Sequence, residues 1–233
     1  MDTRLPASWR RTGEILRWRG AWILFLLGVR SLLRPLVYWH VYRIFITDIA
    51  SQVPEPYAKE NVETRIYSRA TPAYQEDLEK IAEEVESLGE ITRDEAAKRL
   101  ERGDSLAVAY VQAEPAGYGW LSFTNGVVEL AFGVTWRVHT GEAVRYGNFV
   151  HPKWRGRGIQ SAINTAINRH ALERGVSHTL ASISTFNTQS LSLAKHYNRA
   201  TAMKVTLIRI RPLRWTICRP SGASFDSRFQ RTI

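Results

Sequence analysis

Apolar residues recur along this chain at two different spacings, and the changes between them predict an alternation of strands and helices. Alternating apolar and polar residues bury one face of a strand, whereas apolar residues at every third or fourth position bury one face of a helix. The expected strands cover residues 62–68, 106–111, 116–123, 142–150, 179–184 and 202–210. The expected helices cover residues 73–88, 92–101, 160–174 and 188–198. The stretch that leads into residue 142 shows neither spacing and is expected to be irregular.

The pattern divides the chain into four parts. Residues 1–50 form a basic, aromatic-rich extension that is expected to be an amphipathic helical segment. Residues 51–61, which contain two prolines, read as a linker. Residues 62–212 hold the regular alternation and are expected to form one α/β (α+β) domain. Residues 213–233, rich in Arg and Ser, are expected to be a basic irregular tail.

Charge adds a preference for anionic partners. The net charge is +10 at pH 7, from 32 Lys and Arg against 22 Asp and Glu, which suits nucleic acid, anionic lipid or a polyanionic cofactor. Much of the excess is N-terminal, since residues 1–47 hold eight arginines against Asp2 and Glu14. Cys218 is the only cysteine, so an intrachain disulfide is excluded and a reducing, cytoplasmic compartment is favoured.

The most apolar run, residues 21–29, is nine residues long, whereas a bilayer-spanning helix needs roughly 20. Arginines bracket the run and no small-x-small cleavage site follows, so neither a spanning helix nor a signal peptide is favoured. A helix lying in the membrane interface is one interpretation, because four of the eight tryptophans fall in the first 39 residues among these arginines. A helical hairpin packed on the α/β domain or on a second subunit is the other, and the pattern gives both equal weight.

The clearest chemistry lies in residues 149–160, Phe-Val-His-Pro-Lys-Trp-Arg-Gly-Arg-Gly-Ile-Gln. An expected strand ends in a proline-marked turn, and a basic, glycine-rich loop then opens a helix. Gly156 and Gly158 let the backbone approach a ligand, and N–H groups at a helix start point at negative charge. Arg155 and Arg157 add charge-assisted donors suited to phosphate oxygens. The alternative is a solvated basic turn.

This segment closely resembles motif A of the GNAT superfamily of acyl-CoA-dependent N-acyltransferases. In that family a strand ends in Val-x-Pro and leads into Arg/Gln-x-x-Gly-x-Gly/Ala around the coenzyme A pyrophosphate. The residues that match the second part are Arg155, Gly156, Arg157, Gly158, Ile159 and Gln160. Gln160 stands where a small residue is usual, so its side chain either crowds the pyrophosphate or points away and leaves only its backbone N–H for binding.

The element order also matches the GNAT fold over about residues 62–212, which implies a mixed central sheet flanked by helices. The resemblance implies acetyl-CoA, or another acyl-CoA, as co-substrate, without a metal. It assigns the pantetheine arm and the thioester to the backbone at the end of the motif A strand, which corresponds to Phe149, Val150 and His151.

The closing motif of the family resembles the stretch from Asn187 to Tyr197, although the Gly-Phe that usually follows is absent. By this resemblance Asn187 contacts the pantetheine or the reacting end, and the Tyr197 hydroxyl, with an ordinary pKa near 10, protonates the leaving thiolate. From the residues alone, Asn187 equally suits the cap of the following helix, and Tyr197 equally suits a core position.

The general base is the least clear residue. Glu142 is the first candidate, because strand alternation places it on the same face as Tyr146, Asn148 and Val150. Glu129 and His151 are further candidates, and for either glutamate a solvated surface position is the alternative. The six histidines show no metal-ligand spacing, and neither a Walker-type Gly-Lys-Ser/Thr nor a hydrolase Gly-x-Ser-x-Gly motif occurs.

Together these observations predict an N-acyltransferase that moves an acetyl group from acetyl-CoA to a primary amine by direct attack on the thioester. The expected acceptor is a small-molecule or lipid-linked amine, and nucleic acid is the less favoured partner. The expected location is the cytoplasm, with peripheral contact to the inner membrane face as one role for residues 1–50. The competing class is a non-catalytic module that binds CoA, a nucleotide or nucleic acid on the same scaffold.

Overall fold

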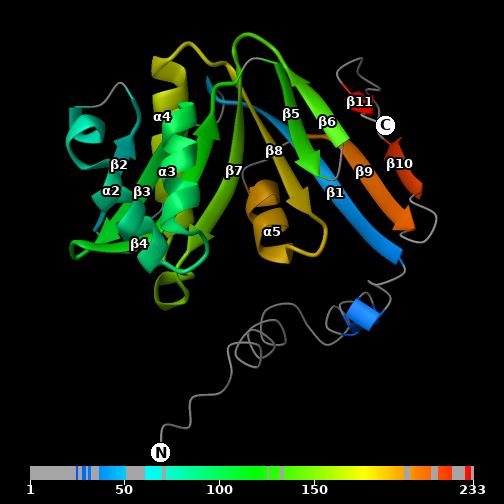
Figure 1. Cartoon of the computed structure of the whole chain (residues 1–233), viewed down its shortest axis with the longest axis horizontal. Helices are drawn as coiled ribbons and strands as arrows, with labels where there is room; N and C mark the ends of the chain where they lie inside the picture. The colour runs from blue at the N-terminus through cyan, green and yellow to red at the C-terminus, as the bar shows by residue number, and fades with distance from the viewer. Residues whose placement is uncertain are drawn as a thin grey trace, which may run out of the picture. The chain divides into compact units, whose positions relative to one another are not determined.

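The computed structural model describes residues 25, 28, 29, 31, 32, 37–50, 61–69, 72–124, 126–131, 134–196, 200–210, 215–221 and 229–231. These residues belong to two compact units, which are taken separately below (Figure 1). The first unit comprises residues 1–45 and 182–227, and the second comprises residues 46–181 and 228–233. Strands β1 (Val37–Asp48) and β8 (His178–Ser184) contribute residues to both units.

The second unit is built on a mixed sheet, as expected. Its strands follow the order β2 (Val62–Tyr67), β3 (Ser105–Val111), β4 (Glu114–Ser122), β7 (Glu142–Val150) and β8. The pairs from β2 to β7 are antiparallel, whereas β7 and β8 run parallel. The turn between β3 and β4 is formed by Gln112 and Ala113, which both have positive φ.

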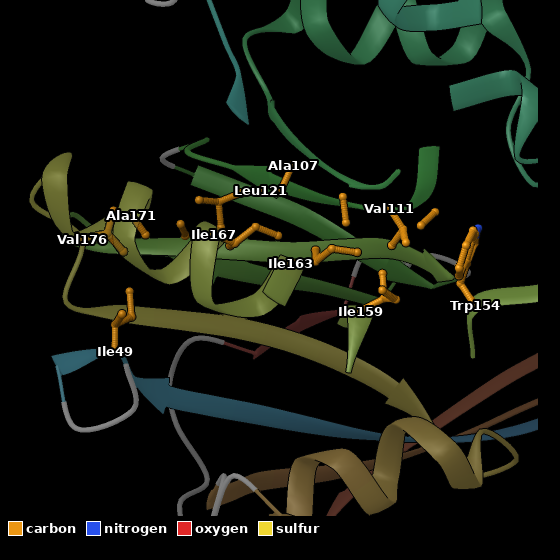
Figure 2. Packing of buried hydrophobic residues seen from close by; sticks show 13 residues of the cluster. Ile49, Ala107, Val111, Leu121, Trp154, Ile159, Ile163, Ile167, Ala171 and Val176 are labelled. Carbon is orange, nitrogen blue, oxygen red and sulfur yellow. The ribbon is translucent and has the colours of Figure 1, made fainter. Parts of the chain in front are cut away.

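Helices cover both faces of this sheet. Helices α2 (Pro72–Ser87) and α3 (Arg93–Arg102) bury apolar side chains against one face, in a cluster that includes Val85, Leu100 and Trp120. Helix α4 (Ile159–Glu173) covers the opposite face. Figure 2 shows its isoleucine side chains directed toward the strands that carry Ala107 and Leu121. The alternation and helical spacing in the sequence therefore predicted these three helices within one or two residues.

Helix α3 shows why the boundaries follow the sequence. Thr92 precedes the helix in an extended conformation, and its hydroxyl accepts a hydrogen bond from the Glu95 N–H. Gly103 ends the helix in the left-handed conformation, with φ of 100°, and its N–H bonds back to carbonyl groups of the last turn. The cap and the glycine fix both ends of a helix that carries Arg99 and Arg102 in its last turn.

The stretch before residue 142 is not irregular as expected. It contains β5 (Gly126–Ala131) and β6 (Val134–Val138), which pair antiparallel, and β11 (Phe229–Arg231) pairs with β6. The three strands form a second, smaller sheet. Their β-branched residues favour extended backbone, and the short strand lengths concealed the period-two pattern.

In the first unit the strand order is β10 (Trp215–Ser221), β9 (Ala200–Ile210), β1 and β8, and helix α5 (Thr188–His196) follows β8. Two expectations are corrected here. Val37–Asp48 is a strand rather than part of a helical extension over 1–50, because its β-branched and aromatic residues favour extended backbone after Pro35. The described residues of the segment 213–233 are not irregular, since they form β10 and β11.

Of the extension before β1, residues 25, 28, 29, 31 and 32 are helical, and the rest lies outside the described part of the chain. Residues 51–60 of the expected linker lie outside it as well. None of the helices formed by the described residues has the length and apolar content needed to cross a membrane.

Candidate functional site

The motif A strand, β7, carries a bulge near its end. Between Tyr146 and Phe149, β7 has two residues, Gly147 and Asn148, where β4 has only Gly119. Gly147 adopts a positive φ of 56°, which glycine reaches without a steric penalty. A bulge bends the strand and increases its twist, so the last residues of β7 leave the line set by its first half.

The bulge also changes which side chains share a face. Tyr146 and Phe149 both pack with the cluster under α2 and α3, while Val150 packs with the cluster under α4. The expectation that Glu142, Tyr146, Asn148 and Val150 lie on one face is therefore wrong, because the extra residue reverses the alternation between Tyr146 and Val150.

Two glycines of β4 allow this geometry. A Cβ atom on Gly119 would lie 2.6 Å from Asn148 Oδ1 and 2.9 Å from Ile163 Cγ2. A Cβ atom on Gly117 would lie 2.6 Å from the Phe149 carbonyl oxygen. The two glycines of the Gly-Tyr-Gly sequence thus let the end of β7 and helix α4 lie closer to β4 than a residue with a side chain would permit.

Parallel pairing between β7 and β8 covers only the first half of β7. The ladder runs from the pair Glu142–His178 to the pair Arg145–Ala181, and the described residues show no further β7–β8 pair. Backbone polar groups along this edge from residue 146 to 150 are consequently not used by a β8 ladder. This is the end of the strand to which the resemblance assigns the pantetheine arm.

A tight turn connects β7 to the glycine-rich loop. The His151 N–H donates to the Ala116 carbonyl at 2.9 Å, and residues Pro152–Trp154 form one turn of 3₁₀-helix. The Lys153 N–H donates to His151 Nδ1 at 3.3 Å, so that ring nitrogen serves as an acceptor that caps the turn. Trp154 is buried beneath the loop and packs in the α4 cluster.

The two loop arginines lie in different environments. Arg155 Nε donates to the Val150 carbonyl at 3.1 Å, and its guanidinium lies 5.9 Å from the centre of the Phe149 ring. Arg155 therefore ties the loop to the end of β7. The Arg157 guanidinium lies 5.1 Å from the centre of the Trp154 ring, so a cation–π contact holds its charge at the loop itself.

The start of α4 supplies backbone donors. Gly156 and Gly158 have φ values of 77° and 85°, and Gly158, the N-cap residue, has no side chain to accept a hydrogen bond. The first intrahelical bond runs from the Ala162 N–H to the Gly158 carbonyl, so the N–H groups of Ile159 and Gln160 have no partner within the helix. These donors and the positive end of the helix dipole form a site suited to an anion.

The side chain of Gln160 is directed along the helix. Its Nε2 donates to Asn164 Oδ1 at 3.3 Å, and Arg145 Nη2 donates to the same oxygen at 2.6 Å. Arg145 Nη1 also donates to Asn168 Oδ1 at 3.3 Å, and the three residues of this network, Arg145, Asn164 and Asn168, are buried. The Gln160 side chain therefore points away from the first turn of α4, toward the following turn. Of the two alternatives for Gln160, this arrangement agrees with the one in which only its backbone N–H is available for binding.

Glu142 is not placed to act at this loop. It is the first residue of β7, and its Oε2 accepts a hydrogen bond from the His139 N–H at 3.0 Å. At about 3.3 Å per residue, an extended strand separates Glu142 from Val150 by about 26 Å. The Glu142 carboxylate therefore fixes the turn that precedes β7, and its assignment as general base stays a prediction from the sequence.

The remaining sequence candidates belong to the first unit or lie outside the described residues. Asn187 Oδ1 accepts a hydrogen bond from the Ser190 N–H at 3.2 Å, which is the capping role at the start of α5. Tyr197 and the side chain of Glu129 lie outside the described part of the chain. Among the described residues, no three His, Cys, Asp or Glu side chains gather as a potential metal site.

Sequence reasoning missed several polar residues around β7. Arg145 stands in an apolar strand, and Asn164 and Asn168 stand on the buried side of α4, a combination that signals a buried polar network. Arg99 lies on α3, and its guanidinium lies over the rings of Trp120 and Tyr146. No local pattern singles out Arg99, because its position depends on how α3 packs on the sheet.

Comparison with solved structures finds proteins that resemble this chain to different extents. A functionally unknown conserved protein from Staphylococcus epidermidis aligns with a TM-score of 0.51 and 12% identity, over 77% of this chain and 65% of that protein. A GCN5-related N-acetyltransferase from Sphaerobacter thermophilus aligns with a TM-score of 0.49 and 15% identity, over 78% and 54%. An aminoglycoside N-acetyltransferase in complex with CoA aligns with a TM-score of 0.40 and 16% identity, over 58% and 89%.

The chain thus spans less than two thirds of the first two of these proteins. No curated protein sequence matches the chain. A family profile does match: that of the acetyltransferase (GNAT) family aligns with residues 64–197, which is more than half of the 233 residues. This match covers the sheet from β2 to β8, the bulge and the glycine-rich loop, and the chain therefore belongs to the acetyltransferase (GNAT) family.

Proposed function

We propose that the protein transfers an acetyl group from acetyl-CoA to a primary amine by direct attack of the amine on the thioester. The observation that carries this proposal is the geometry from Val150 to Gln160. There, the part of β7 that follows its last pair with β8, Arg145–Ala181, runs into a loop with two left-handed glycines and an uncapped helix start. Family membership supports the proposed reaction type, and the glycines and free helix N–H groups of the loop support it as the place where the acyl donor binds.

Each part of the loop has a role in this proposal. The N–H groups at the start of α4, together with Gly156 and Gly158, bind the CoA pyrophosphate, and Arg157 adds a positive charge held on Trp154. Arg155 holds the loop against the Val150 carbonyl, and its positive charge adds to the attraction for the pyrophosphate. The backbone of Phe149, Val150 and His151 carries the pantetheine arm, because amide groups there can pair with it as a neighbouring strand would.

The reaction needs no covalent enzyme intermediate. The amine nitrogen forms a bond to the carbonyl carbon, the carbon–sulfur bond breaks, and the CoA thiolate leaves. A backbone N–H near the end of β7 stabilises the carbonyl oxygen as it gains charge. The proton that the amine loses is accepted through water, and the thiolate takes a proton from the Tyr197 hydroxyl, an assignment that rests on the resemblance of residues 187–197 to the family.

The test is turnover with a panel of primary amines. Protein and acetyl-CoA are incubated with each amine, and free CoA and the acetylated amine are quantified by chromatography and mass spectrometry, which avoids thiol reagents that would also label Cys218. Equal amounts of CoA and acetylated amine are expected, and Tyr197→Phe is expected to lower kcat while the dissociation constant for acetyl-CoA stays unchanged. Binding of acetyl-CoA without turnover of any amine would instead support a non-catalytic CoA-binding module.

We also propose that residues before β1 bring the protein to the surface of an anionic membrane. Phe25, Val29 and Leu32 follow one another at helical spacing of four and three residues, and they are 59%, 39% and 80% exposed. An exposed apolar face within an arginine-rich segment suits the boundary between headgroups and acyl chains. Such a location would favour lipid-linked amines as acceptors.

Vesicle binding tests this second proposal. The protein is sedimented with vesicles of phosphatidylglycerol and phosphatidylcholine, or of phosphatidylcholine alone, at low and at physiological salt. Binding to the anionic vesicles that is lost in a Phe25→Ser, Leu32→Ser double variant supports membrane contact. Equal recovery of wild type and variant with the anionic vesicles contradicts it and favours packing of this segment on protein.

A further inference from the structure

Arg99 reaches the bulge of β7 from helix α3. Its guanidinium carbon lies 5.3 Å from the centre of the Trp120 ring and 5.0 Å from that of the Tyr146 ring. Its Nε is bonded to Glu95 Oε1 at 2.9 Å, and 20% of the side chain is exposed. Two aromatic rings and one carboxylate therefore hold the guanidinium in a fixed orientation at the protein surface.

The two rings in contact with Arg99, those of Trp120 and Tyr146, are themselves held in place by other residues. The Tyr146 hydroxyl donates to the Asp104 carboxylate, which also accepts hydrogen bonds from Arg102. The Asp104 side chain is almost fully buried, and burial together with Asp104 raises the pKa of Tyr146, so the phenol stays protonated as a donor. Trp120 is fully buried, and its ring lies 6.3 Å from that of Tyr146.

The free end of the guanidinium is directed at the bulge. Arg99 Nη1 lies 2.9 Å from the position that a Cβ atom on Gly147 would occupy. Gly147 and Asn148 are exposed, and they immediately precede Phe149, where the acyl donor is proposed to bind. The neighbouring Nε1 of Trp120 is buried and has no hydrogen-bond partner among the described residues, so this part of the bulge is rich in donors.

We propose that Arg99 binds an anionic group, a carboxylate or a phosphate, on the amine acceptor, and so selects acceptors that carry such a group near the reacting nitrogen. This inference rests on the proposed function and names its substrate class. A guanidinium preorganised on aromatic rings loses little side-chain entropy when it pairs with an anion, and its planar pair of amino groups fits carboxylate and phosphate oxygens. The adjacent bulge brings that anion beside the end of β7.

A purely structural role for Arg99 is the competing explanation, since its ring contacts also tie α3 to the sheet. The two explanations differ in one measurable property. A structural arginine affects the unfolding midpoint and affects all acceptors equally, whereas a binding arginine affects anionic acceptors alone. A Glu95→Gln variant sharpens the difference, because it removes the negative charge beside Arg99 without touching the rings and is expected to tighten the binding of anionic acceptors.

The experiment uses two matched pairs of amines: glycine with glycinamide, and glucosamine 6-phosphate with glucosamine. Binding of each compound is measured by calorimetry, with and without CoA, for wild type, Arg99→Gln, Arg99→Lys and Glu95→Gln. Arg93→Gln is the matched control, since Arg93 lies on the same helix and pairs with Glu79 and Glu83. The first pair tests a carboxylate and the second a phosphate. Unfolding midpoints confirm that every variant is folded.

We expect one anionic compound to bind about tenfold or more tightly than its neutral partner. Arg99→Gln should remove this preference, Arg99→Lys should keep part of it, Glu95→Gln should increase it, and Arg93→Gln should leave it unchanged. Equal binding within both pairs, or a preference that survives in Arg99→Gln, overturns the proposal. Binding of CoA itself is scored separately, so a protein that prefers the anionic amine but does not bind CoA refutes the acetyl-CoA proposal rather than this one.

Discussion

The amide nitrogen of Gln160 donates to the amide oxygen of Asn164, 3.3 Å away and one turn further along α4. This bond directs the Gln160 side chain away from the first turn of the helix, where the proposed pyrophosphate site lies. The same Asn164 oxygen accepts from Arg145, so the position at which this chain departs from its family is joined to a buried network between α4 and β7.

If Gln160 points away from the anion site, its side chain contributes little to CoA binding. Gln160→Ala is therefore expected to change the dissociation constant for CoA by less than about threefold, which is less than 1 kcal/mol. It should lower the free energy of unfolding by about 0.5–1.5 kcal/mol through loss of the bond to Asn164. Calorimetry and urea unfolding give the two numbers. A large gain in CoA affinity would show that Gln160 crowds the pyrophosphate.

Asn164 should matter more for stability than for binding. Asn164→Ala removes the acceptor that holds the buried Arg145 guanidinium, and we expect a loss of about 1–3 kcal/mol or more in the free energy of unfolding, measured in urea. Asn164→Asp is the matched variant, because it keeps the acceptor oxygens and adds a charge opposite to that of Arg145. An aspartate variant no more stable than the alanine variant would contradict the assigned role of this bond.

The close approach of β4, β7 and α4 predicts that Gly119 does not tolerate a methyl group. Gly119→Ala places a Cβ atom against Asn148 and against two isoleucines of α4, which is overpacking and costs about 1–3 kcal/mol of unfolding free energy. Asn148 is exposed, so Asn148→Ala alone should be nearly neutral and should recover part of the loss in the Gly119→Ala background. Additive effects of the two substitutions would show that the bulge does not contact Gly119 as described.

His170 gives a pH dependence with a defined sign. Burial, with a smaller effect from Arg174, lowers the pKa of this histidine below its ordinary value of 6.5, and its Nε2 is bonded to Ser105 Oγ at 3.0 Å. The unfolded chain therefore binds a proton more readily than the folded one. The stability from neutral His170 is fully present above pH 6.5 and is lost as the pH falls below 6.5 through the lowered folded pKa.

Urea unfolding of wild type and His170→Gln at pH 7.5 and at pH 5.5 measures this effect. The wild type should lose more stability than the variant on going to the lower pH, because the variant has no group to protonate at this position. An equal loss in both proteins would mean that His170 does not titrate differently in the folded and unfolded states.

The elements that were predicted best from the sequence are those whose pattern lies in one contiguous stretch of residues. The strand 142–150 was predicted with its observed bounds, and the glycine-rich loop was recognisable because every residue of its motif is contiguous. The strand Val37–Asp48 was missed because the preceding apolar, arginine-rich run suggested that the helix continues through it. Short strands such as Gly126–Ala131 were missed because too few residues show the alternation.

Features that depend on pairing between distant segments were not predictable. The bulge at Gly147 requires the register between β7 and β4, and without it the side of the sheet that Tyr146 occupies was assigned by simple alternation. Arg99 reaches the bulge only because α3 packs on that face. Glu142 is a further example. Its residue type suits a general base, but it begins β7, and at about 3.3 Å per residue it lies about 26 Å from Val150 at the other end of the strand.

The measurement that tests the central claim most directly is calorimetric titration of acetyl-CoA and CoA into wild type, Arg155→Ala, Arg157→Ala and Arg93→Ala. Micromolar binding by wild type is predicted, with affinity about tenfold or more weaker in Arg157→Ala and Arg155→Ala, because each removes a charge-assisted contact or the tie that shapes the loop. Arg93→Ala, with the same change in net charge on the α2–α3 hairpin, should bind as wild type does. Absence of binding by wild type, or equal affinity in all four proteins, would contradict an acyl-CoA site at the glycine-rich loop.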